Sequence, residues 1–152
     1  MRAPNVVNNC RPVVAVDPGH TKCGVAVVTP AGDVLFKDVI PAAMVVDTVR
    51  VLYDDHDAGL VVVGGGTTSA DVVEHLTSFF GEDDITTVEE SHTTLQARAL
   101  YWADNKPGCL ARFVPTGLLI PPRPLDDYAA VVIARRHFDT RHADTHSPEK
   151  GT

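Results

Sequence analysis

The feature that most constrains this sequence is an apolar run at residues 12–16, PVVAV, which stops at Asp17-Pro18-Gly19. A valine-rich segment without alternating polar residues is typical of a strand that is buried on both faces. Such a strand lies inside a sheet that carries helices on both sides, which predicts an α/β fold. The chain has 152 residues, of which 44% are hydrophobic and 22% charged, enough for one domain with a packed core.

The spacing of apolar residues predicts the other elements. Strands are expected at residues 12–16, 24–28, 34–40, 60–63 and 85–88, and helices at about 42–56, 69–80, 93–105 and from Asp126 onward. Short connections make the first three strands an antiparallel meander, whereas the later strands alternate with helices, as parallel strands do. We therefore expect a mixed five-stranded sheet with helices on both faces.

Local signals suggest where two helices begin and where the domain ends. Ser69 is predicted to be the N-cap of the second helix, and Thr93 with Gln96 has the spacing of a capping box. The polar end of the chain is expected to fray. The expected organisation is an N-terminal tail at residues 1–11, a single domain at 12–138 and a flexible polar tail at 139–152.

The cysteines and the N-terminus indicate a compartment. Cys10, Cys23 and Cys109 show neither the pattern of a disulfide framework nor the spacing of zinc ligands. The N-terminus lacks the long apolar stretch of a secretory signal, and no apolar run is long enough to cross a bilayer. We therefore expect a cytoplasmic protein without a membrane partner.

Acidic residues stand where the predicted elements begin or end. Asp17 follows the first strand, Glu89 and Glu90 follow the fifth, and Asp126 and Asp127 begin the last helix. Ligands of open α/β sheets gather beyond the carboxyl ends of the strands, so several of these carboxylates are expected to converge. Converging carboxylates bind Mg²⁺ or Mn²⁺, and metal-assisted phosphoryl transfer follows most naturally. Each acid also has a structural interpretation, as part of a turn, a solvated strand end or a helix cap.

Three motifs together resemble the YqgF (RuvX) group of ribonuclease H-like nucleases, which is related to the RuvC Holliday-junction resolvases. The motifs are VDPGHTKCGVAV at residues 16–27, VEESHTTLQA at 88–97 and DDYAAVVI at 126–133. The resemblance covers residues 12–138 and implies a ribonuclease H-like fold with a mixed five-stranded sheet. It also implies a divalent-metal nuclease, linked to Holliday-junction resolution or to processing of the precursor of small-subunit ribosomal RNA.

The same resemblance implies which residues form the site. The catalytic, metal-binding acids carry over as Asp17, Glu90 and Asp126, with Asp127 as a candidate fourth ligand. They would hold two Mg²⁺ or Mn²⁺ ions in a two-metal mechanism. The partner would be branched DNA or precursor rRNA. Symmetric cutting of a junction requires two active sites, which makes a homodimer possible.

Residues beside these acids and in a glycine loop are expected to contact the substrate. The loop joins a predicted strand to a predicted helix, so its backbone amides can bind a phosphate. A lysine in the turn after Asp17 and two histidines next to proposed ligands have the chemistry to bind phosphate or assist proton transfer. The expected contacts are His20, Lys22, Gly65, Gly66, Thr67, His92 and Thr93.

Departures from the YqgF pattern keep other hypotheses open. Ser91 stands where the family has an arginine, His92 replaces an apolar residue, and GGGTTS at 64–69 replaces a Gly-hydrophobic-Pro loop. The alternative function is a nucleic-acid-binding domain that keeps the fold with weakened or lost activity. A third possibility, a domain of the actin and sugar-kinase superfamily, would need two such domains around a nucleotide.

The net charge of −7 is unevenly distributed along the chain. Residues 1–90 carry 5 Lys and Arg against 14 Asp and Glu, whereas residues 91–152 carry 8 against 6. Bound divalent ions would offset the acids of the site. We therefore expect modest, salt-sensitive and metal-dependent affinity for nucleic acid rather than tight general binding.

Overall fold

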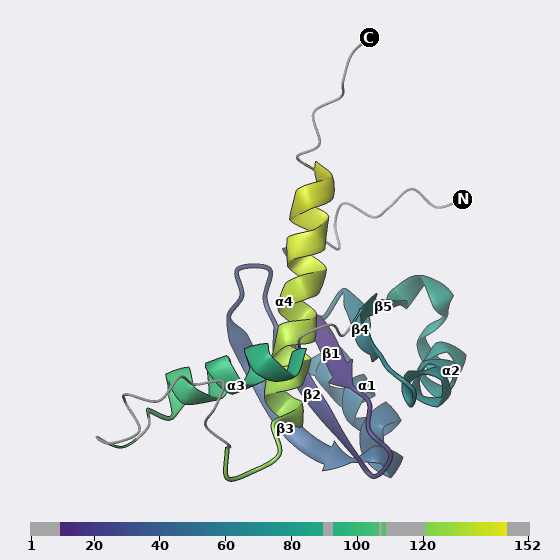
Figure 1. Ribbon diagram of the computed structural model, residues 1–152. Coiled ribbons are helices and arrows are strands. Elements are labelled where there is room, and N and C mark those ends of the chain that lie inside the picture. The colour runs from purple at the N-terminus through teal and green to yellow at the C-terminus, as the bar shows by residue number, and fades with distance from the viewer. Residues whose placement is uncertain (1–9, 90–92, 107, 109–120, 146–152) are drawn as a thin grey trace.

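A computed structural model describes residues 10–89, 93–106, 108 and 121–145 (Figure 1). The strands are β1 (Val13–Asp17), β2 (Lys22–Val28), β3 (Val34–Pro41), β4 (Leu60–Gly65) and β5 (Ile85–Glu89). The helices are η2 (Ala42–Met44), α1 (Val45–Asp55), α2 (Ser69–Phe80), η3 (Glu82–Asp84), α3 (Thr93–Asp104) and α4 (Asp126–Thr145). Within the described ranges, no helix combines the length and the apolar character that crossing a membrane requires.

The strand β1 is central in the five-stranded sheet, whose order is β3-β2-β1-β4-β5. The pairs β1–β2 and β2–β3 are antiparallel, and the pairs β1–β4 and β4–β5 are parallel. Val13, Val14, Ala15 and Val16 are at most 2% exposed, because strands flank them on both sides and helices cover both faces. The predicted α/β class and the mixed five-stranded sheet are confirmed.

The two faces of the sheet carry separate cores. Val14 and Val16 pack with α1 and α2, whereas Val13 and Ala15 pack with α4. Figure 1 shows α4 crossing in front of the sheet and α1 behind it. Side chains alternate between faces along a strand, so Asp17 projects toward the α4 side at the carboxyl end of β1.

The last helix is longer than the sequence predicts. α4 continues to Thr145, so residues 139–145 are helical where a flexible tail is expected. Phe138 is buried in the core that α4 forms with the sheet, and Arg135 donates a hydrogen bond of 3.0 Å to the Gly32 carbonyl. These contacts hold the middle of α4 against the sheet and against the turn between β2 and β3. The helix continues from there to Thr145 with mostly exposed residues, which the polar composition alone does not indicate.

Two predicted helix caps have other partners. Ser69 is the first residue of α2 rather than its N-cap, and its hydroxyl donates to the Gly66 carbonyl at 2.6 Å. The helix α3 begins at Thr93 as predicted, but the Gln96 side chain accepts a hydrogen bond of 3.0 Å from Arg136 of α4. The side chain of Ser69 closes the glycine loop, and that of Gln96 joins two helices.

A glycine on β2 lets the N-terminus of α4 come against the sheet. Gly24 lies opposite Asp17 in the β1–β2 ladder. A Cβ atom at position 24 would overlap the backbone carbonyl of Asp126 and lie 2.8 Å from the backbone nitrogen of Asp127. Backbone therefore touches backbone here, and only glycine leaves room for it. The contact places Asp126 beside the strand pair that ends in Asp17.

Replacing Gly24 with alanine is expected to lower the free energy of unfolding by about 1–3 kcal/mol or more, because the methyl group overlaps backbone atoms of α4. Urea-induced unfolding measures the change. Gly108→Ala is the matched control, since a Cβ there meets no described atom within 4 Å. Equal stability of the two variants would contradict this packing.

His137 of α4 makes stability depend on pH. Its side chain is buried, and its Nε2 atom has no hydrogen-bond partner among the described residues. Burial, helped by the charge of Arg141, lowers the pKa of His137 to about 4. In the unfolded chain, His137 binds a proton near pH 6.5, whereas in the folded chain it does not. The contribution of His137 to the free energy of unfolding is therefore fully present above pH 6.5 and is lost as the pH falls toward 4.

The melting temperature of His137→Phe should therefore fall less between pH 6.5 and 4 than that of the wild-type protein. Circular dichroism melts across this interval measure the difference. Parallel curves for the two proteins would show that His137 does not titrate in this way.

Candidate active site

The carboxyl ends of β1, β4 and β5 meet at one edge of the sheet, and the N-terminus of α4 lies at this edge (Figure 1). Asp17 is the last residue of β1 and is half-buried. Gly64 and Gly65 end β4, and Glu89, which pairs with Gly65, ends β5. This is the edge at which the sequence predicts converging carboxylates.

Asp126 reaches the same edge from the first turn of α4. Its backbone contacts Gly24, the residue that pairs with Asp17. Cys23, the neighbour of Gly24, responds to both acids: burial raises the pKa of its thiol most, and the charges of Asp17 and Asp126 raise it further. Two carboxylates from opposite ends of the sequence therefore lie at one site.

The electrostatics of this site favour a bound cation. The pKa of Asp126 is raised, first by burial and then by the neighbouring charge of Asp127, while Lys22 opposes the shift. Ionising Asp126 is therefore unfavourable in the folded chain. A divalent cation relieves this, and carboxylate oxygens are the ligands that Mg²⁺ and Mn²⁺ prefer. The donor set of Asp17 and Asp126 fits such an ion.

The third predicted acid cannot be placed beside these two. Glu90 lies outside the described residues, as do Ser91 and His92. Glu89, which precedes Glu90 in the chain, is exposed at the end of β5. In the part of the chain that the structure describes, no group of three or more His, Cys, Asp or Glu side chains is arranged to hold a metal ion.

Asp127 occupies a different environment from Asp126. It is 4% exposed, and its two oxygens accept hydrogen bonds of 3.1 Å from the Arg123 guanidinium. The Nζ atom of Lys37, on β3, lies 3.6 Å from the same carboxylate. The hydrogen bond to Asp127 is the main reason why the pKa of Arg123 is raised. The candidate fourth metal ligand therefore has two cations of the protein as its partners.

Aromatic rings extend this ion pair into an anchor network of Lys37, Tyr101, Arg123, Asp127 and Tyr128. Lys37 Nζ lies 4.1 Å from the centre of the Tyr128 ring, and the Arg123 guanidinium lies 5.3 Å from it. Tyr101 packs edge-on against Tyr128, with ring centres 5.7 Å apart. The Tyr128 hydroxyl donates to a carboxylate at the end of α3 at 3.0 Å. The network joins β3, α3 and α4 and so fixes the first turn of α4.

No local sequence pattern indicates the anchor network as a whole. The spacing of Arg123 and Asp127 was the one available signal, because residues four apart can pair at the start of a helix. Lys37 lies on a strand far away in the sequence, and no local pattern connects it to Asp127.

The predicted contacts His20 and Lys22 line different hollows near the end of β1. Lys22 begins β2 and is close enough to Asp126 to lower its pKa. His20 lines a hollow of about 340 Å³ beside α2, together with Asp71 and His75. Of the two side chains, Lys22 is the one whose charge acts on Asp126.

The glycine loop lies next to the turn that follows β1. Gly65, Gly66 and Thr67 are exposed there. The hydroxyl of Thr68 donates to the Pro18 carbonyl at 3.2 Å, which ties the loop to the residue after Asp17. Thr93, another predicted contact, is the first residue of α3.

Two solved structures of RuvC are similar to this chain over most of its length. RuvC from Thermus thermophilus in complex with a Holliday junction substrate has 21% sequence identity and a TM-score of 0.54, over 87% of this chain and 96% of RuvC. Another Thermus thermophilus RuvC structure has 20% identity and a TM-score of 0.56, over 86% and 96%. A putative sugar kinase from Cytophaga hutchinsonii has 15% identity and a TM-score of 0.41, over 57% and 38%.

No protein-family model and no curated protein matches the chain. The structural likeness nevertheless defines the class of fold, which is ribonuclease H-like. Within that class the chain has the fold of RuvC, with which it shares the mixed sheet and the overall length. The fold implied by the sequence motifs is confirmed.

Asparagine at positions 126 and 127 is expected to change stability in opposite directions. In EDTA at pH 7, Asp126→Asn should raise the melting temperature, because it removes an unfavourable charge. The folded pKa lies above the ordinary value of 3.8, so the cost in the wild-type protein appears as the pH rises through that range. The difference between the two proteins should therefore vanish below about pH 3.8.

Asp127→Asn should instead lower the free energy of unfolding by about 2–3 kcal/mol, because Arg123 and Lys37 lose their counter-charge. The loss is smaller than for a fully buried pair, since the Arg123 side chain is 42% exposed. Thermal and urea unfolding of both variants measure the two effects. Changes of the same sign would contradict the different environments of these acids.

Proposed function

We propose that this chain is a divalent-metal-dependent endonuclease that acts on branched or structured nucleic acid. The observation that carries the proposal is the meeting of Asp17 and Asp126 across Gly24, at the carboxyl edge of a RuvC-like sheet. One RuvC structure was solved with a Holliday junction substrate, which supports a nucleic-acid partner. The sequence motifs of the YqgF group support the same class of reaction and add precursor rRNA as a second candidate substrate.

Asp17, Asp126 and Glu90 are the proposed ligands of Mg²⁺ or Mn²⁺. When bound, two such ions supply an activated water and stabilise the leaving oxygen of a phosphodiester. Asp17 projects from a rigid central strand, and Asp126 is fixed by the first turn of α4. Glu90 follows the last residue of β5 in the chain, and β5 ends at the same edge.

Asp127 is assigned an anchoring role instead of a metal-binding one. Its carboxylate is engaged by Arg123 and Lys37, and removing it from them would leave two cations without a partner. Lys22 is proposed to bind a substrate phosphate beside Asp126, and the amides of Gly65 and Gly66 to contact the backbone of the nucleic acid.

Asp17→Asn and Asp126→Asn should each reduce Mn²⁺-dependent cleavage by more than about 100-fold, because each removes a direct metal ligand. Cleavage of a labelled Holliday junction and of precursor rRNA, under identical conditions, measures the effect and compares the substrates. Calorimetric titration with Mn²⁺ gives a second readout, in which both variants should lose affinity. Asp55→Asn, at an exposed position on α1, is the matched control.

Wild-type rates of Mn²⁺-dependent cleavage in both variants would contradict the proposal. If the wild-type protein binds nucleic acid but neither binds Mn²⁺ nor cleaves its substrate, the result would support the alternative, a binding domain without activity. Mass in solution belongs to the same experiment, because symmetric cutting of a junction requires a homodimer.

A further inference from the structure

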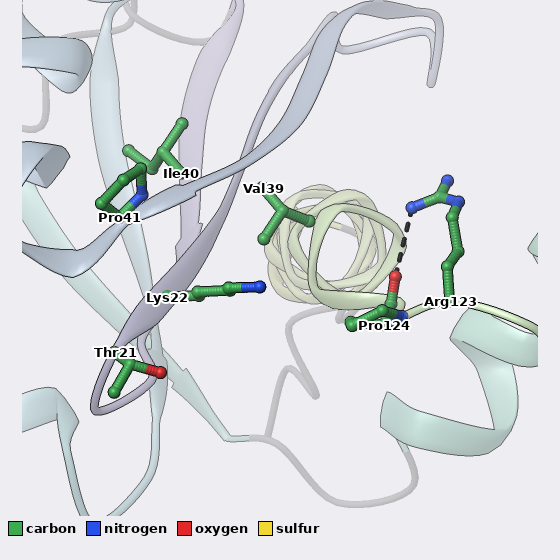
Figure 2. Close-up of a pocket in the computed structure, with 7 residues that line it drawn as sticks. All are labelled: Thr21, Lys22, Val39, Ile40, Pro41, Arg123 and Pro124. Atoms are coloured by element: carbon green, nitrogen blue, oxygen red, sulfur yellow. Dashed lines mark hydrogen bonds between the residues drawn. The ribbon is translucent and has the colours of Figure 1, made fainter.

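A pocket of about 300 Å³ lies between the start of β2, the end of β3 and the chain that leads into α4 (Figure 2). We call it the Lys22 pocket. Its lining residues are Thr21, Lys22, Val39, Ile40, Pro41, Arg123 and Pro124. Pro124 comes two positions before Asp126, so the pocket lies next to a proposed metal ligand.

The pocket combines apolar side chains with one cation that points into it. Val39 and Pro41 on β3 and Pro124 before α4 supply apolar surface from two segments of the chain. Figure 2 shows the Lys22 ammonium directed into the space between Val39 and Pro124, with Arg123 on the far side. A ligand in this pocket would meet one positive charge and an apolar wall.

Lys22 is the cation that remains available there. Arg123 makes two hydrogen bonds of 3.1 Å to Asp127, and Lys37 lies 3.6 Å from the same carboxylate. No ion pair of Lys22 is found among the described residues. The Asp127 carboxylate engages both cations of the anchor network, whereas the Lys22 ammonium, near Asp126, is directed into the pocket and is placed to bind an external anion.

We propose that the Lys22 pocket binds one unpaired nucleotide of the nucleic-acid substrate, with a backbone phosphate on Lys22 and the sugar and base against Val39, Pro41 and Pro124. This inference rests on the proposed function, because it places the nucleotide next to the phosphodiester that is cleaved. It goes beyond that function by naming what the enzyme selects in its substrate.

A nucleotide fits the pocket in charge, polarity and size. Its phosphate would meet the Lys22 ammonium group, and its sugar and flat base would pack against the apolar lining residues. A volume of about 300 Å³ lies at the lower end of small-molecule sites, which suits one nucleotide rather than a base pair. Bases in a continuous duplex are stacked and paired, so only an extruded or unpaired nucleotide can enter.

The pocket therefore favours substrates that already contain unpaired nucleotides. Extruding a paired base costs a few kcal/mol, whereas a nucleotide at an open branch point has lost its pairing before it binds. A phosphate contact with Lys22 alone would carry no such preference, because phosphates are the same in both substrates.

Fluorescence anisotropy in EDTA tests the inference with the wild-type protein and two labelled DNA junctions, at an ionic strength low enough for both junctions to bind measurably without metal. One junction has unpaired nucleotides at its branch point, and the other has the same arms fully paired. The wild-type protein is expected to bind the first at least about 10-fold more tightly. Equal affinities would overturn the proposal.

Thr21→Trp is designed to fill the pocket from an exposed position on the turn before β2. It should abolish the preference and leave affinity for the fully paired junction within about 2-fold. Ala31→Trp, exposed on the turn between β2 and β3, is the matched control and should keep the preference. Val39→Phe fills the same pocket from β3 and replaces Thr21→Trp if that variant does not fold. A retained preference in the pocket-filling variant, or an equal loss for both junctions, would overturn the proposal.

Lys22→Gln should weaken binding to both junctions and reduce the salt dependence of affinity by about one phosphate contact. Arg50→Gln, on the exposed side of α1, is its control and should change neither quantity. An unchanged salt dependence for Lys22→Gln would count against the phosphate contact. Because no metal is present, failure here leaves the nuclease proposal standing, and failure of metal-dependent cleavage leaves this binding result interpretable.

Discussion

The site depends on one contact between two stretches of backbone. Gly24 has no side chain, so the first turn of α4 lies directly on β2, opposite the end of β1. The separation of Asp17 and Asp126 is therefore set by a sheet and a helix rather than by long, flexible side chains. Sites on regular elements hold their ligands more precisely than sites on loops. The backbones that carry the two carboxylates are therefore held in a fixed relation to each other.

Asp126 and Asp127, which are adjacent on α4, carry charges that the fold treats in opposite ways. Asp126 carries a charge that the fold disfavours, whereas Asp127 carries one that Arg123 and Lys37 stabilise. Proteins commonly accept unfavourable electrostatics at functional positions and offset the cost elsewhere. Here the ion pairs of Asp127 offset the cost of the charge on Asp126, and both residues lie in the same turn of α4.

Much of the fold could be predicted because its signals are local. The valine run before Asp17 indicated a central strand, and the alternation of the later strands with helices indicated the parallel half of the sheet. The length of α4 could not be predicted from its polar composition, since Phe138 packs on the sheet and Arg135 bonds to the turn between β2 and β3, both far away in the sequence. The role of Asp127 could not be predicted for the same reason, because its partner Lys37 comes from β3. A sequence motif with two adjacent acids does not show that their environments differ.

The position of α4 also determines when Asp17 and Asp126 can come together during synthesis of the chain. The ribosome makes β1 and β2 before α4, so Val13, Ala15, Ala26 and Val28 present a bare apolar surface until α4 emerges. Nascent chains with such exposed surfaces are prone to aggregate and depend on chaperones. The same event that covers this surface brings Asp126 to Asp17, so a nascent chain cannot assemble its pair of acids before its second core has closed.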